Sequence, residues 1–287
     1  MVCSQVFDHT SVLQFLESIV KVREPNISSW RRAVCGDLSS CFQPAAKSRG
    51  NDPDFPGRDA VLERIHKAQF RPLPASFRRS HDARQEPGVR PSLPLPYELY
   101  AAGALTPDRR SVEISLEARK GTGAPFHVYT PRLYRGRADL RTRAYAVEAG
   151  KKITDTWDLE GFDRAVYSLA IHGPNGFLRE LSGSAADPAI TLRCDYKSSG
   201  DLAVLVTNTG KTPHTIRLAN HMYKGRDYSA TVKPGETSTI PLKLAASHSW
   251  FDFTLKVDGA DLFTRRCAGR VETGRLGFSD PVMGGLA

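Results

Sequence analysis

The sequence predicts a mainly β fold in which two antiparallel β-sandwich modules follow one another along the chain. Beyond Tyr97, short segments alternate apolar with polar residues, the pattern of strands with one buried face. Glycine, asparagine and proline separate these segments, as they do in sandwiches built of short strands. A repeat with an offset of about 85 residues indicates that one module occurs twice.

The alternating positions define the expected strands. In the first module they are Val112, Ile114, Leu116, Phe126, Val128, Tyr167, Leu169 and Ile171. In the second module they are Val204, Val206, Ile216, Leu218, Ala230, Val232, Ile240, Leu242, Leu244, Phe253, Leu255 and Val257. We therefore expect the first sandwich over 96–184, the second over 185–278 and a tail over 279–287.

Two stretches carry the repeat. Residues 147–150 match 232–235, and each leads into a strand that contains threonines. Residues 167–177 match 253–263, and both copies have the pattern strand, tight turn, strand. A duplicated hairpin explains this pattern, with Gly173 and Gly259 able to take a positive φ at the turn.

The amino-terminal region predicts helices. Apolar residues recur at helical spacing between Val12 and Ile19, which predicts an amphipathic helix of about three turns. Asp8 or Thr10 is placed to cap its first turn. A lone helix of this length is marginal in water, so its apolar face needs a partner. Residues 26–42 predict a turn and one or two short helices, capped by Ser28 or Ser29.

A linker is expected over 44–95. Proline, arginine, serine, aspartate and glycine dominate it, and this composition buries too little apolar surface to order itself. A short helix over 60–70 is the exception that we expect within it.

Charge and cysteine content narrow the range of partners. Lys and Arg total 40 against 31 Asp and Glu, a net charge of +9 that suits phosphate groups, an anionic membrane surface or nucleic acid. Because the basic residues are scattered, we expect a solvated surface and no nucleic-acid partner. The five cysteines lack CxxC spacing. Cys35 and Cys41 could form a disulfide or remain free thiols.

Two segments show a family resemblance. Residues 6–17 (VFDHTSVLQFLE) and 29–38 (SWRRAVCGDL) are similar to the end of the hydrolase domain of bacterial phosphocholine-preferring phospholipases C, of the alkaline-phosphatase-like superfamily. Residues 95–99 (LPYEL) and the two repeats resemble the paired carboxy-terminal modules of that family. The resemblance implies that 1–43 is a helical remnant of an α/β hydrolase domain.

The resemblance also implies a chemistry. The family hydrolyses phosphatidylcholine or sphingomyelin to diacylglycerol or ceramide and phosphocholine, with a hydroxyl nucleophile and a divalent metal held by carboxylates. The motifs that carry these groups lie upstream of residue 6 in the family and have no matching position here. We therefore expect an inactive chain with no catalytic, cofactor-binding or metal residues, whose partner is the amino-terminal hydrolase domain.

Export is a further expectation from the family. The compact helix signal close to Met1 suggests a start inside a domain, and no signal-peptide pattern or apolar run of 18 residues is present. The resemblance implies a periplasmic or extracellular enzyme, whereas the chain as it stands would remain in the cytoplasm.

Isolated polar residues are weak candidates for a site. Asp8 and His9 form a tempting catalytic pair, but we interpret Asp8 as a helix cap, because no hydroxyl partner or second carboxylate is near in sequence. The histidines beyond Tyr97 lack partners at metal-ligand spacing, namely His127, His172, His214, His221 and His248. Residues 121–123 (GTG) lack the lysine and helix of a phosphate cradle and predict a turn.

A stand-alone binding module is the alternative function. Such a module would bind a membrane surface, a carbohydrate or a protein, and it would expose Tyr134, Tyr223, Trp157 and Trp250. Our preferred interpretation instead places Trp30, Trp157 and Trp250 in a core or an interface. A nucleic-acid binder would need a contiguous basic stripe with interleaved aromatics.

Overall fold

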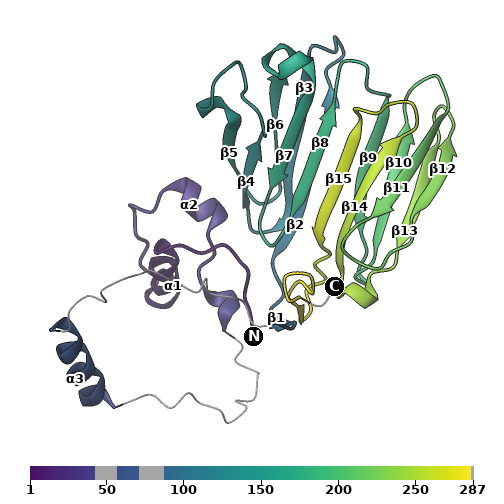
Figure 1. The fold of residues 1–287 in the computed structure, drawn as a ribbon. Coiled ribbons are helices and arrows are strands. Elements are labelled where there is room, and N and C mark those ends of the chain that lie inside the picture. The colour runs from purple at the N-terminus through teal and green to yellow at the C-terminus, as the bar shows by residue number, and fades with distance from the viewer. Residues whose placement is uncertain (43–56, 71–86, 286–287) are drawn as a thin grey trace. The chain divides into compact units, whose positions relative to one another are not determined.

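The computed structural model describes residues 1–42, 57–70 and 87–285 and confirms the mainly β fold (Figure 1). The chain divides into two units, one of Met1–Cys41 with Pro87–Ala287 and one of Phe42–Glu86. The smaller unit contains α3 (Arg58–Gln69), close to the predicted 60–70 helix. Residues 44–56 and 71–86 of the expected linker lie outside the described residues, as does residue 43.

The first repeat is a sandwich of a three-stranded and a four-stranded antiparallel sheet. The three-stranded sheet has the order β2-β3-β6, with β2 (Tyr97–Leu105), β3 (Ser111–Gly121) and β6 (Lys151–Asp158). The four strands opposite have the order β8-β7-β4-β5, with β4 (Ala124–Tyr129), β5 (Thr142–Val147), β7 (Tyr167–His172) and β8 (Leu178–Gly183).

The second repeat has the same strand order. Its three-stranded sheet is β13-β10-β9, with β9 (Ile190–Tyr196), β10 (Leu202–Asn208) and β13 (Thr237–Leu242). The four strands opposite are β12-β11-β14-β15, with β11 (His214–Asn220), β12 (Tyr228–Val232), β14 (Trp250–Val257) and β15 (Thr264–Arg270). The duplication seen in the sequence is therefore a duplication of structure.

The two four-stranded sheets join into one sheet of eight strands through β8 and β15. The strand order is β12-β11-β14-β15-β8-β7-β4-β5. From the centre outward, each strand of one repeat has its equivalent at the same place on the other side. Glu180 lies directly opposite Arg266, and these two residues occupy matching positions in the two repeats. The repeats are thus related by a pseudo-twofold axis through this pair, like the partners of an isologous dimer.

Each sandwich has its own apolar core. Residues such as Val112, Phe126 and Leu169 are fully buried in the first, and Val204, Ile216 and Phe253 in the second. The inward faces predicted from alternation are confirmed, except that Ala230 is only partly buried. Period-two patterning identified the core because successive side chains of a strand point to opposite faces.

The turn glycines differ between the repeats. Gly259 adopts φ +77° as predicted, but the prediction for Gly173 is wrong, and Asn175 (φ +54°) and Gly176 (φ +73°) take the left-handed conformation instead. The residue before a proline is restricted to extended conformations, and Pro174 follows Gly173 directly. The reversal of the chain is therefore displaced toward Asn175.

The amino-terminal segment packs on the first repeat. It contains α1 (Thr10–Val20), α2 (Ser29–Val34) and a 3-10 turn (Ser39–Cys41). Ser28 caps α2 by accepting a hydrogen bond from the Arg31 N–H, as predicted. The N–H of Val6 donates to the Tyr97 hydroxyl at 2.9 Å, which ties the segment to β2. Cys35 and Cys41 are both free thiols.

Ordered backbone pairing begins before Tyr97. A short strand β1 (Pro91–Ser92) pairs with β16 (Gly277–Phe278), and Val2 bridges to Ser92. This strand falls within the segment expected as linker. Within the described part of the chain, no helix is long and apolar enough to cross a membrane.

Candidate functional site

Asp8 holds the start of α1. Its Oδ1 accepts hydrogen bonds from the Thr10 N–H (2.8 Å) and hydroxyl (2.6 Å), and its Oδ2 accepts from Arg31 Nε at 2.8 Å. Burial raises the pKa of Asp8, but the hydrogen bonds from Thr10 and Arg31 outweigh it and leave that pKa below its usual value. The residue at the formal N-cap, His9, is exposed and makes no capping bond. Asp8 therefore links α1 to α2.

The structure pairs two histidines that looked isolated in the sequence. His127 on β4 and His172 on β7 are direct cross-strand neighbours, and both lie beside the ring of Tyr129. Sequence reasoning missed this pair because strand pairing, and not sequence distance, decides it. His221 instead contacts the Thr254 hydroxyl at 2.6 Å, and the ring of His248 packs on Phe278.

A metal site is not assembled from these groups. Among the described residues, no three or more His, Cys, Asp or Glu side chains converge as metal ligands. The divalent metal implied by the family resemblance stays a prediction for the hydrolase portion.

The aromatic residues named for a binding surface do not form one. Trp157, Tyr134 and Trp250 are buried, which agrees with the core or interface position preferred for the two tryptophans, whereas Trp30 is 50% exposed. The ring of Trp157 packs against Tyr134 at 4.8 Å, and Arg143 stacks over it at 3.9 Å. Tyr223 is half-buried and donates to Asp280. Burial follows from the inward position of Trp157 on β6, which the sequence alternation did not single out.

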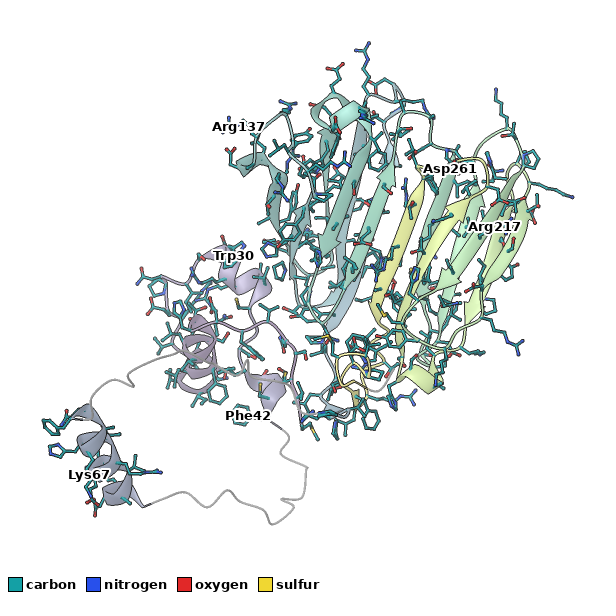
Figure 2. The ribbon with its side chains drawn as sticks, viewed as in Figure 1. Trp30, Phe42, Lys67, Arg137, Arg217 and Asp261 are labelled. Carbon is teal, nitrogen blue, oxygen red and sulfur yellow. The ribbon has the colours of Figure 1, made fainter. Side chains whose placement is uncertain are left out.

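Several exposed arginines of the described residues are already engaged. Arg137 lies on the first repeat and Arg217 on the second, and each is paired with an aspartate (Figure 2). Arg109 donates to the backbone carbonyls of Ala185 and Asp187, so it bridges the repeats. Trp30 is half exposed on α2. Arg78 and Arg79 lie outside the described residues.

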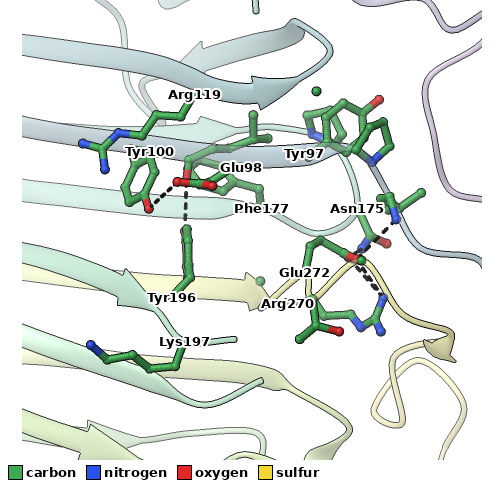
Figure 3. A pocket seen from close by; sticks show the side chains of 18 of the residues that line it. Tyr97, Glu98, Tyr100, Arg119, Asn175, Phe177, Tyr196, Lys197, Arg270 and Glu272 are labelled. Atoms are coloured by element: carbon green, nitrogen blue, oxygen red, sulfur yellow. Dashed lines mark hydrogen bonds and ion pairs between the residues drawn. The ribbon is translucent and has the colours of Figure 1, made fainter. Parts of the chain in front are cut away.

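The candidate site that the structure does form is a cavity of about 550 Å³ at the seam between the repeats. We call it the seam cavity. Its walls are the start of β2, the end of β9, the turn after β7 and the chain after β15 (Figure 3). Aromatic side chains line one part, among them Tyr100, Phe177 and Tyr196.

A buried ion pair forms the other part of the seam cavity. Arg270 Nη1 donates to Glu272 Oε1 at 3.1 Å, and the two side chains are only 5% and 10% exposed. Asn175 Nδ2 donates to the same Glu272 oxygen at 3.1 Å. Burial raises the pKa of Glu272, and the charge of Arg270 opposes that rise. Arg270 Nε is buried without a hydrogen-bond partner among the described residues.

Sequence reasoning missed the seam cavity. Tyr97 and Glu98 stood in a motif used for the family resemblance, which was the available signal. Asn175, Arg270 and Glu272 carried none, because they meet only when the two repeats are joined.

The fold and the cavity define a tandem β-sandwich protein with pseudo-twofold symmetry. The family profile described as "Bacterial phospholipase C, C-terminal domain" matches residues 91–184 and 188–270, one match for each repeat. The chain belongs to the bacterial phospholipase C family, of which it matches the carboxy-terminal part.

Curated relatives agree with the family profile. The chain is 36% identical to the non-hemolytic phospholipase C of Pseudomonas aeruginosa and 33% identical to that of Burkholderia pseudomallei. Each alignment covers 98% of this chain and 41% of the relative. The hemolytic phospholipase C of P. aeruginosa is 32% identical, again over 98% of this chain and 42% of the relative. The chain thus spans about two fifths of the length of these relatives.

The comparison with solved structures found only low similarity. A transglutaminase from red sea bream covers 57% of this chain at 12% identity with a TM-score of 0.21.

Proposed function

We propose that these residues form the carboxy-terminal portion of a phospholipase C and position its hydrolase portion, without hydrolysing lipid themselves. The whole enzyme would cleave phosphatidylcholine or sphingomyelin and release phosphocholine. The hydrolase portion would supply the nucleophile and the divalent metal, and the enzyme would act after export. The relatives support this reading, since they are phospholipases C of which this chain matches the carboxy-terminal part.

One observation carries the positioning role, the exposed apolar stripe of α1. Val12, Leu16 and Ile19 are spaced by four and three residues and are 52%, 47% and 59% exposed. Residues at this spacing share one face of a helix. We call these three residues the α1 stripe.

The α1 stripe is held in place by the rest of the segment. Arg32 on α2 binds Glu17 on α1 through both carboxylate oxygens, at 2.8 and 2.9 Å. α2 itself lies against β4 and β5. A fixed apolar face that the described residues leave about half exposed, on the segment that resembles the end of the hydrolase domain, suits packing against the remainder of that domain.

The test joins the hydrolase portion of the P. aeruginosa non-hemolytic relative to the amino terminus of this chain. Release of phosphocholine from phosphatidylcholine vesicles is measured with divalent metal present. We expect turnover by the fusion and none by the 287 residues alone. Turnover by the short chain alone would contradict the proposal and would direct attention to Asp8 and His9.

Variants of the fusion locate the contact. Leu16→Glu places a carboxylate in the proposed interface, so we expect turnover and melting temperature of the hydrolase portion to fall, the former by about tenfold or more. Leu262→Glu is the matched control, since Leu262 is 50% exposed in the turn after β14. Equal effects of the two variants would refute docking through the α1 stripe.

A further inference from the structure

We propose that the seam cavity binds an uncharged, hydroxyl-rich ring, the chemistry of a sugar. Its volume of about 550 Å³ lies in the range of small-molecule sites and suits one or two sugar rings. Both repeats supply its walls, so the site exists only in the joined molecule.

The charges of the seam cavity favour a neutral ligand over a simple ion. Each cation that lines it is already paired with a carboxylate. Arg270 pairs with Glu272 at 3.1 Å, and Lys197 pairs with Asp195 at 2.6 Å. Arg119 also lines the cavity and pairs at 2.7 Å with Glu117, which does not line it. A small inorganic ion would compete with these pairs for their charged groups, above all with the buried pair of Arg270 and Glu272, whereas a neutral ligand leaves them intact.

One buried donor in the wall of the seam cavity lacks a partner among the described residues. Glu272 is already engaged at both oxygens, since Oε1 accepts from Arg270 Nη1 and Asn175 Nδ2, and Oε2 accepts from Arg270 Nη1 and the Leu95 N–H. The Nη2 end of Arg270 abuts Gly277, where an added Cβ would lie 1.6 Å from it. Nε is a buried guanidinium donor that lacks a partner in the described part of the chain. A hydroxyl oxygen meets this need, because it can accept a hydrogen bond from Nε without adding charge to the cavity.

Aromatic rings supply the apolar contacts that the C–H faces of a sugar require. The ring centroids of Tyr100 and Tyr196 lie 5.1 Å apart (Figure 3). The guanidinium carbon of Arg119 lies 4.1 Å from the Tyr100 centroid, over one face of that ring. Phe177 adds a further ring to the lining. Aromatic faces beside amide, carboxylate and guanidinium groups give a ring-shaped polar ligand both packing and hydrogen bonds.

Saturation-transfer NMR and calorimetry with the full chain test the proposal. The probes are D-glucose, D-galactose and N-acetylglucosamine as neutral rings, phosphocholine as a zwitterion and inorganic phosphate as an anion. We expect a neutral sugar to bind with a dissociation constant on the order of millimolar. Binding of phosphocholine or phosphate alone, or no sugar binding at tens of millimolar, would overturn it.

Variants tie the binding to the seam cavity. Tyr100→Ala removes an aromatic wall, and Asn175→Gly removes the amide while tolerating the φ of +54° at this turn. Each should weaken sugar binding about tenfold or more. Tyr129→Ala is the control, because Tyr129 is exposed on β4 outside the seam cavity. Undiminished binding in folded Tyr100→Ala and Asn175→Gly proteins would refute the site.

The sugar could be free or carried by a lipid. Vesicles with and without galactosylceramide distinguish these sources, with free galactose as competitor. Retention on the glycolipid vesicles that galactose reverses identifies a lipid-borne ring. Binding of free sugar without vesicle retention identifies a soluble one, and both outcomes depend on Tyr100 under the proposal.

Discussion

Two buried arginines join the repeats at matching positions. Arg179 on β8 donates through Nη1 to the carbonyl of Ala268 at 2.9 Å, across the seam. Arg265 on β15 donates through Nη1 to the carbonyl of Ser182 at 2.7 Å, in the opposite direction. Nη1 of each arginine also donates a hydrogen bond to the backbone carbonyl of the preceding residue in the chain. Hydrogen bonds from a charged donor are stronger than neutral ones, so these side chains stabilise the joined sheet.

Arg265 has a buried carboxylate partner that makes its role measurable. Its Nη2 lies 3.4 Å from Asp187 Oδ2, and both side chains are less than 9% exposed. Arg265→Met leaves Asp187 buried without its cation, so we expect the free energy of unfolding in urea to fall by about 3–5 kcal/mol.

A double variant provides the control for Arg265→Met. Arg265→Met with Asp187→Asn removes both charges and should recover a substantial part of that loss. Strictly additive losses in the two single variants would show that the pair is not coupled.

At the scale of elements, the ion pair between α1 and α2 fixes the α1 stripe. Hydrogen bonds from Arg32, and then from the Glu24 N–H, lower the pKa of Glu17 to about 2, against an ordinary value of 4.5. A carboxyl with a lowered pKa in the folded state stabilises that state above its unfolded pKa. The stabilisation is lost as the pH falls toward the folded pKa.

The pH dependence of stability tests this pair. We expect the native chain to be more stable than Glu17→Gln above about pH 4.5, and the difference to vanish as the pH falls toward about 2. Urea unfolding at a series of pH values measures it. The control is Glu63→Gln on α3, where the pair with Lys67 is 64% exposed on both sides. Exposed pairs contribute little, so this variant should match the native chain at every pH.

At the scale of the whole molecule, one charge pair favours the joining of unlike repeats. Glu180 lies opposite Arg266 at the pseudo-twofold axis, with 3.3 Å between Oε2 and Nη1. Two copies of the second repeat joined in the same register would place Arg266 against Arg266, and two copies of the first would oppose Glu180 to itself. Like charges directly opposite each other destabilise a strand pair.

Separately produced repeats test this preference. Residues 87–184 and 185–287, mixed in equal amounts, should form a heterodimer by light scattering, while each alone stays monomeric. Glu180→Arg should prevent the heterodimer, and adding Arg266→Glu in the other repeat should restore it. Homodimers of either repeat as abundant as the heterodimer would contradict this role for the charge pair.

Local pattern made much of this fold predictable. The alternation of Val112, Ile114 and Leu116 and the spacing within α1 report which face of an element is apolar, and Ser28 reports a helix start. These features depend on residues a few positions apart. The turn at Gly173 shows the limit even at short range, because Pro174 moved the positive φ to Asn175 and Gly176.

Two sandwich repeats, their core faces and the amphipathic helix follow from the amino-acid sequence alone, because each is encoded by neighbouring residues. The pairing of β8 with β15 into one sheet of eight strands depends instead on long-range contacts. That pairing buries Arg179 and Arg265, which look like surface residues in the sequence, and brings Asn175, Arg270 and Glu272 into one cavity. Contacts between residues about a hundred positions apart produce no periodic pattern in the sequence, so the interface between the repeats could not be predicted from it.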